Sequence, residues 1–176
     1  GVGALVVRRG TDVAARIRGG GQEMGRRSGT ETLVGIAGFG AAAEAAAGDL
    51  DRGAWSRIRE FREILENGIA QFSNETIFVG KDANRLPNTS CFVTPGWKGE
   101  TQVMVMDLAG YAVSAGSACS SGKVRASRAL VAMGYDEIAA GSALRVSLGP
   151  TTTETEVLGF VAAWGREYEK FRARGR

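Results

Sequence analysis

Three segments of this 176-residue sequence carry side chains that could do chemistry. The first is SAGSACSSG, residues 114–122, in which Cys119 stands among glycine, alanine and serine. Such small neighbours loosen the backbone and leave room for another molecule to approach the sulfur. The chain has no histidine to deprotonate the thiol, so the residues alone leave a nucleophile and an ordinary loop thiol equally open. Cys91, in TSCFV, has apolar neighbours and is interpreted as structural.

The second segment is ALRVSLG, residues 143–149, where Arg145 is the one charged residue of an apolar run. The planar guanidinium of an arginine matches a carboxylate that accepts two parallel hydrogen bonds. The segment therefore predicts a carboxylate-binding site. An ion pair between Arg145 and one of the chain's own acids is an equally open interpretation.

The third segment is GGGQEMGRRSGT, residues 19–30, which brings glycines, two arginines and hydroxyl groups just ahead of a predicted helix. These are the parts of an anion-binding loop, because backbone N–H groups and a helix N-terminus both favour negative charge. The glycine spacing does not match the G-x-G-x-x-G pattern of dinucleotide-binding folds. Taken alone, a plain surface loop is the more frequent explanation.

Composition excludes several classes of function. The two cysteines form no C-x-x-C pair and no histidine is present, so zinc, iron–sulfur and thioredoxin-like sites lack their ligands and we expect no metal. The net charge of +3 is modest and basic residues alternate with acidic ones, which argues against nucleic acid. No apolar run approaches the roughly 18 residues of a membrane span, and no signal segment is visible. We expect a cytoplasmic protein with no membrane partner.

The elements that position these residues follow from periodicity and turn residues. We expect a strand at Ala4–Val7, a helix over residues 33–47 that Thr30 or Thr32 could cap, and an amphipathic helix over about residues 51–72. Further on, short strands are predicted within residues 76–80, 89–96, 111–116 and 143–149, and helices over 100–108, 127–133 and 154–172. Interleaved strands and helices indicate an α/β or α+β layered fold. A boundary between two parts is placed near residues 48–51.

Taken together, these segments resemble one family. GVGAL, GGGQEMGRRSGTE, LPNTS, SAGSACSSGKV, ALVAMG and LRVSLGPTTTETEV occur in the order and at about the spacing typical of the cysteine desulfurases of the nitrogen-fixation and housekeeping iron–sulfur branch. The resemblance implies the aspartate-aminotransferase fold of the pyridoxal-phosphate (PLP) enzymes, an α/β fold, and a homodimer. It implies conversion of L-cysteine to L-alanine, with a persulfide left on the enzyme for a sulfur-acceptor scaffold or carrier protein. Residues 1–50 would end the large PLP-binding domain, and residues 51–176 would form the small α+β C-terminal domain with a mobile cysteine loop.

The resemblance also implies roles for single residues. Cys119 is similar to the nucleophile that accepts sulfur, and Arg145 to the arginine that holds the substrate carboxylate. Thr30 resembles the threonine that reaches across the dimer to the cofactor phosphate of the other subunit. Arg27 adds positive charge in the same motif, and Asn88 is interpreted as a structural residue of the turn into a strand.

One departure from the family pattern limits what the chain by itself is expected to do. The family's Schiff-base lysine lies upstream of GVGAL, and Lys81, Lys98 and Lys170 stand in polar turns or on a charged helix. We therefore expect the chain alone to be an inactive part of a desulfurase. Alternatives are a related PLP enzyme, namely a selenocysteine lyase or a class V aminotransferase, and a noncatalytic module that binds a partner in sulfur transfer. An aminotransferase has no need of the Cys119 thiol.

Overall fold

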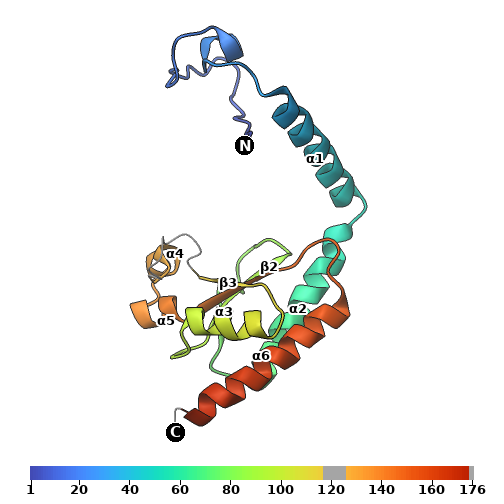
Figure 1. Ribbon diagram of the computed structural model, residues 1–176, viewed down its shortest axis with the longest axis vertical. Coiled ribbons are helices and arrows are strands. Elements are labelled where there is room, and N and C mark those ends of the chain that lie inside the picture. The colour runs from blue at the N-terminus through green and yellow to red at the C-terminus, as the bar shows by residue number, and fades with distance from the viewer. Residues whose placement is uncertain (117–125, 175–176) are drawn as a thin grey trace. The chain divides into compact units, whose positions relative to one another are not determined.

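The computed structural model describes residues 1–116 and 126–174 (Figure 1). The chain divides into two compact units, Gly1–Arg52 and Gly53–Arg176. Helices and a sheet are both present, which confirms the predicted α/β class. The two units are described separately below.

The first unit contains a short 3₁₀ helix, η1 (Gln22–Gly25), and the helix α1 (Leu33–Asp51). The predicted helix is confirmed and runs four residues further than expected. Thr32, one of the two residues predicted to cap it, is the N-cap residue, although its side chain makes no capping hydrogen bond. The strand at Ala4–Val7 was wrong. A strand needs a neighbour to satisfy its backbone groups, and no described residue pairs with this segment, whose Val6 is 96% exposed.

Helix α1 corrects one expectation about membranes. An 18-residue window of this 19-residue helix has a mean hydropathy of 1.3, which makes the helix long and apolar enough to cross a membrane by length and composition alone. Much of that apolar character comes from alanine and glycine, and Glu44 lies well inside the helix. A charged side chain at the centre of a membrane helix costs about 3 kcal/mol on insertion scales. Length and composition are weak evidence for a span, and Glu44 opposes it.

The second unit is a four-stranded antiparallel sheet with helices around it. The strand order is β1 (Ile77–Phe78), β2 (Thr89–Val93), β4 (Ala143–Ser147) and β3 (Ser114–Ala115). The helices are α2 (Ala54–Phe72), α3 (Gly99–Leu108), α4 (Arg128–Ala132), α5 (Glu137–Gly141) and α6 (Glu154–Arg174). All the strands and helices predicted after residue 50 are present within two or three residues of their expected starts, and the strands are shorter than predicted. Helix α5 was missed, because five residues are too few to show a helical period.

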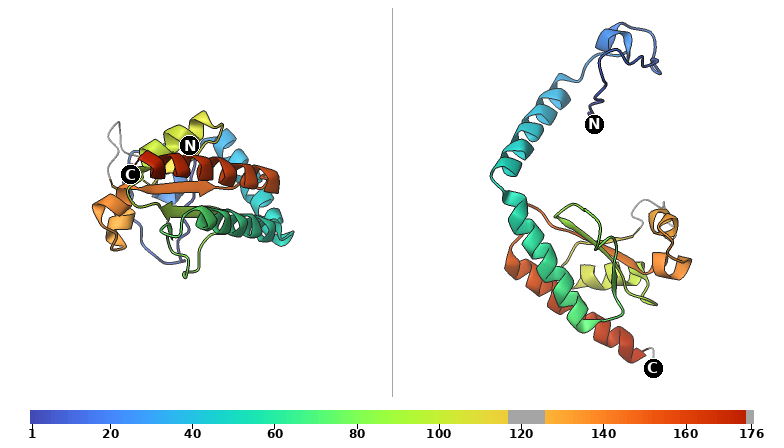
Figure 2. Two further views of the ribbon diagram at one scale, coloured as in Figure 1. Left: turned by 90° about the horizontal axis from the view of Figure 1, so that it is seen from below. Right: turned by 180° about the vertical axis from the view of Figure 1, so that it is seen from behind.

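The long helices α2 and α6 lie side by side (Figures 1 and 2). Glycine allows this close approach: a Cβ added to Gly68 of α2 would stand 2.6 Å from a Val161 methyl, and one added to Gly165 of α6 would overlap the ring of Phe72. The apolar stripe of α2 faces inward as predicted, with Ile58, Leu65 and Ile69 buried. The two helices thus form one layer of the main core.

The sheet has two different faces, because side chains alternate along each strand. Phe92 of β2 and Leu144 of β4 are register partners and pack into the main core with α2 and α6. The opposite face carries Val93 and Ala143, which pack with Leu130 of α4 and Ala140 of α5 in a second apolar cluster. Full burial of each large apolar side chain contributes about 1.5–3 kcal/mol to stability. The second face is therefore covered by α4 and α5 at the end that carries Val93 and Ala143.

A buried polar cluster holds the chain that enters β2. The carboxylate of Glu66, on α2, accepts two hydrogen bonds from Arg85 at 2.7 and 2.9 Å and one from the Ser90 hydroxyl at 2.8 Å. The hydrogen bond to Glu66 raises the pKa of Arg85 above its usual value. Beside this cluster, Asn88 donates from its amide to the carbonyl of Leu148 at 3.5 Å. Asn88 thus lies where the expected structural role at the turn into β2 requires.

Helix α6 begins with a reciprocal cap. Glu156 accepts hydrogen bonds from the backbone N–H and the hydroxyl of Thr153, both at 2.8 Å, and the Thr153 hydroxyl accepts one from the Glu156 N–H at 3.3 Å. This is the capping-box pattern, which satisfies N–H groups that a helix start leaves unpaired. The backbone bond from Thr153, followed by the hydroxyl bond, lowers the pKa of Glu156.

This cap predicts a pH-dependent stability. Because the folded pKa of Glu156 is lowered, its ionised form stabilises the fold above the unfolded pKa of about 4.3, and that contribution is lost as the pH falls through the folded pKa. We expect Glu156→Gln to lower the melting temperature at pH 7 and to cost progressively less below about pH 4. Thermal unfolding of the two proteins across pH measures this, with Glu169→Gln on the same helix as control. An equal loss at pH 3 and pH 7 would contradict it.

Candidate active site

Arg145 lies at the centre of a row of three residues that crosses the sheet. Strand β4 runs between β2 and β3, and Arg145 is the register partner of Cys91 on one side and of Ser114 on the other. Register partners project from the same face of a sheet. Arg145 is exposed, whereas Cys91 and Ser114 are half-buried. The row lies on the second face of the sheet, beyond the part that α4 and α5 cover.

The guanidinium of Arg145 has no acidic partner in the part of the chain that the structure describes. No carboxylate there lies within 4.0 Å of it, and no hydrogen bond of its side chain is present among the same residues. Residues 117–125 and 175–176, outside the described part, contain neither aspartate nor glutamate. The ion-pair interpretation of Arg145 therefore finds no partner in the described residues, and the guanidinium is available to an external carboxylate.

Cys119 lies outside the described residues, so its surroundings are not part of this structure. Gly116, the last described residue before it, donates its backbone N–H to the carbonyl of Ala143 on β4 at 2.9 Å. Cys119 follows Gly116 by three positions in the sequence.

Cys91 is a half-buried thiol. Burial raises the pKa of Cys91, and the nearby charge of Arg145 lowers it by a smaller amount, so that the pKa stays above its usual value. The thiolate is the nucleophilic form of cysteine. Cys91 is consequently protonated and weakly reactive at neutral pH, in agreement with its structural interpretation.

The glycine loop of the first unit is held by its own hydrogen bonds. The Ser28 hydroxyl accepts from the N–H of Gly20 at 2.8 Å and donates to the carbonyl of Gly20 at 3.1 Å. Arg27 pairs with Glu23 at 3.2 Å and donates to the carbonyl of Gly29 at 2.8 Å. Arg27 is thus engaged inside the loop, and a direct ligand contact is not needed to explain it.

The same loop ends at Thr30, which is exposed. Within the loop, Glu23 and Met24 adopt positive φ angles of 51° and 57°, a conformation that side chains other than glycine seldom take. The exposed Thr30 hydroxyl is accessible to a ligand such as a phosphate, whereas the N–H groups of Gly20, Ser28 and Gly29 already donate within the first unit. Thr30 belongs to the first unit and Arg145 to the second, and the structure does not place these two residues relative to one another.

The described lysines lack the buried surroundings that a lysine bound to PLP requires. Lys81 lies over the ring of Phe78 at 5.7 Å, Lys98 is exposed, and Lys170 pairs with Glu167 at 2.6 Å on the surface of α6. A fourth lysine, Lys123, lies outside the described residues. None of the three described lysines has the buried setting that a cofactor lysine needs. The described residues therefore fit PLP only at its phosphate, through Thr30 and its loop.

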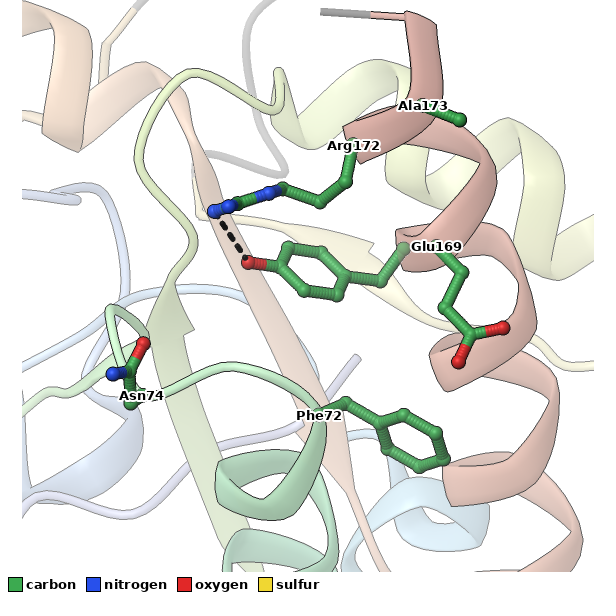
Figure 3. A pocket seen from close by; sticks show the side chains of 6 residues that line it. Phe72, Asn74, Glu169, Arg172 and Ala173 are labelled. Atoms are coloured by element: carbon green, nitrogen blue, oxygen red, sulfur yellow. Dashed lines mark hydrogen bonds between the residues drawn. The ribbon is translucent and has the colours of Figure 1, made fainter. Parts of the chain in front are cut away.

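A pocket of about 380 Å³ in the second unit lies away from these residues. It is lined by Phe72, Asn74, Tyr168, Glu169, Arg172 and Ala173 (Figure 3). Arg172 donates to the Tyr168 hydroxyl at 3.5 Å and to Glu75 at 3.3 Å, and these bonds raise its pKa. The pocket contains neither a nucleophile nor any of the residues that the sequence singled out. We therefore place the candidate site at Arg145.

Comparisons with known proteins identify relatives of this chain. The profile of the aminotransferase class-V family matches residues 1–160. Over 157 residues the chain is 44% identical to a cysteine desulfurase of Cereibacter sphaeroides and 39% identical to the cysteine desulfurase NifS of Azotobacter vinelandii, covering 89% of this chain in both cases. A solved NifS-like protein from Rickettsia africae ESF-5 superposes with a TM-score of 0.78 at 30% identity over 90% of this chain.

The chain spans about two fifths of the length of these relatives, 40% of the first, 39% of the second and 41% of the solved structure. Residues 1–160, which the family profile matches, include the glycine loop, the sheet, and the three candidate site residues Thr30, Cys119 and Arg145. The chain belongs to the aminotransferase class-V family.

Proposed function

We propose that a protein carrying this chain is a PLP-dependent cysteine desulfurase, which converts L-cysteine to L-alanine and retains the sulfur as a persulfide on Cys119. The names of the relatives support the reaction class. The observation that carries the proposal is Arg145. Its guanidinium lies on an open sheet face without an acidic partner in the described residues, one strand away from the chain that leads to Cys119.

In this proposal the chain's own residues bind the substrate and accept its sulfur. Arg145 holds the carboxylate of L-cysteine by two charge-assisted hydrogen bonds and so orients the amino acid. The thiolate of Cys119 attacks the substrate sulfur, so that an S–S bond forms and the Cβ–S bond breaks. The electron pair of the broken bond stays on Cβ, which takes up a proton and becomes the methyl group of alanine. Atoms and electrons balance, since one thiol and cysteine give one persulfide and alanine.

The cofactor requirement follows from this carbon chemistry. PLP, when bound, supplies the electron sink that lets the Cβ–S bond break. In the described part of the chain the residue proposed to hold it is Thr30, whose hydroxyl would donate to the cofactor phosphate. The Schiff-base lysine is proposed to lie in another part of the protein, because none of the described lysines is buried.

The reaction is tested by incubating the protein that carries this chain with L-cysteine, PLP and a thiol reductant. We expect alanine and sulfide in equal amounts. Alanine without sulfide would contradict persulfide chemistry, and the absence of both would favour the noncatalytic sulfur-transfer module. The same assay with L-selenocysteine separates a selenocysteine lyase, which would turn over that substrate alone.

We further propose a cytoplasmic homodimer in which Thr30 serves the neighbouring subunit and the persulfide passes to an acceptor protein for iron–sulfur cluster assembly. Mixed dimers can test the role of Thr30. One subunit carries Thr30→Ala and the other lacks its own cofactor lysine. If Thr30 acts across the interface, the subunit with Thr30→Ala keeps its cofactor when its partner supplies an intact Thr30, and cofactor release shows this by absorbance. Loss of cofactor from the subunit that bears Thr30→Ala would contradict the exchange.

A further inference from the structure

The surroundings of Arg145 on its sheet face are uncharged. Its register partners are Cys91 on β2 and Ser114 on β3. Its neighbours on its own strand and the diagonal positions of β2 are likewise uncharged: Ala143, Ser147, Thr89 and Val93. A single carboxylate at one of these positions would reach the guanidinium, because neighbouring Cβ atoms on one face lie about 4.5–8 Å apart. None of these described neighbours on the sheet face can therefore form an ion pair with Arg145.

Cys91 is a half-buried register partner of Arg145. It packs against the second apolar cluster, whose members include Val93, Leu130 and Ala143. The cluster also contains the titratable side chain of Tyr135. The charge of Arg145 acts directly on the Cys91 thiol, and burial outweighs this effect and keeps the thiol protonated. Cys91 is thus a small, neutral side chain fixed by packing beside the guanidinium.

We propose that Cys91 is a specificity-determining neighbour of Arg145, whose neutral side chain keeps the guanidinium available to the carboxylate of an amino-acid substrate. This inference rests on the proposed function for the identity of the substrate. It goes beyond that function by assigning the half-buried cysteine to the carboxylate subsite. Cys91 acts through Arg145 and takes no part in the transfer of sulfur.

The first test changes the charge at Cys91 without changing its size. Cys91→Asp introduces a carboxylate opposite Arg145, and Cys91→Asn is the isosteric uncharged reference. We expect the KM for L-cysteine of the aspartate variant to exceed that of the asparagine variant at least tenfold, with kcat changed much less, because an internal carboxylate competes with the substrate for the same guanidinium. Equal KM values for two folded variants would overturn the proposal.

The second test uses the native Cys91 and needs no turnover. In a Cys119→Ser background, alkylation at Cys91 is followed by peptide mass spectrometry with iodoacetate, which carries a carboxylate, and with neutral iodoacetamide. In both reactions the sulfur forms a bond to carbon and iodide leaves. An available guanidinium attracts the anionic reagent, so Arg145→Gln should lower the ratio of the iodoacetate rate to the iodoacetamide rate about fivefold, the attraction of opposite charges about 4 Å apart in water. A change in the thiolate fraction of Cys91 alters both rates by the same factor and therefore leaves their ratio unchanged.

The outcomes separate this inference from the proposed function. An unchanged alkylation ratio overturns the role of Cys91 even in an active desulfurase. A ratio that falls in a protein that makes no alanine from cysteine supports the carboxylate subsite and removes the desulfurase function. Where Cys91→Asp fails to fold, the alkylation ratio alone decides.

Discussion

We expect replacement of Cys119 by serine to abolish sulfide release from L-cysteine in a protein that carries this chain. A serine hydroxyl is far less acidic than a thiol and cannot form the S–S bond that takes sulfur from the substrate. Turnover under limiting reductant should fall to the background of the assay, while the absorbance of bound PLP stays unchanged. Sulfide and alanine are measured together, so that loss of the sulfur step is distinguished from loss of the cofactor.

The chain offers a matched control for this change. Cys91→Ser alters the second of the two cysteines, and it tests whether any loss of activity is specific to the Cys119 position. Because burial raises the pKa of Cys91, less of this thiol is in the nucleophilic thiolate form at neutral pH, and we expect Cys91→Ser to keep its activity. Undiminished sulfide release by the Cys119→Ser protein would remove Cys119 from the mechanism.

The second large effect is expected at Arg145. Loss of charge-assisted hydrogen bonds to a carboxylate costs about 1.5–3 kcal/mol, which corresponds to roughly a 10- to 100-fold rise in the KM for L-cysteine. Arg145→Ala should therefore raise KM and leave the spectrum of bound PLP unchanged. The KM of Arg145→Lys should lie between that of the unsubstituted protein and that of Arg145→Ala, because an ammonium group keeps the charge and loses the planar pair of donors.

A surface arginine provides the reference for general charge effects. Arg166 is exposed on α6 and belongs to no ion pair among the described residues. Arg166→Ala removes the same charge from the protein at a position that is not part of the row around Arg145. Equal KM values for Arg145→Ala and Arg166→Ala would return Arg145 to the ion-pair interpretation that the sequence left open.

The sequence by itself determined the order of the elements in the second unit apart from α5, and it singled out the segments proposed to carry the chemistry. Helix α2 could be predicted because its apolar residues recur every three to four positions, and Ile58, Leu65 and Ile69 are buried as that pattern requires. The small residues around Cys119 are contiguous in the sequence, and so are the uncharged residues on either side of Arg145. Local patterns of this kind need no knowledge of distant residues.

Only the tertiary structure decided which residues surround Arg145. Strand register pairs it with Cys91 and Ser114, which come from strands distant in sequence, and nothing in the local pattern of either segment specifies that pairing. The missing strand at Ala4–Val7 has the same physical reason. An apolar run becomes a strand only when another strand satisfies its backbone hydrogen bonds, and pairing between distant segments is a property of the fold rather than of the run.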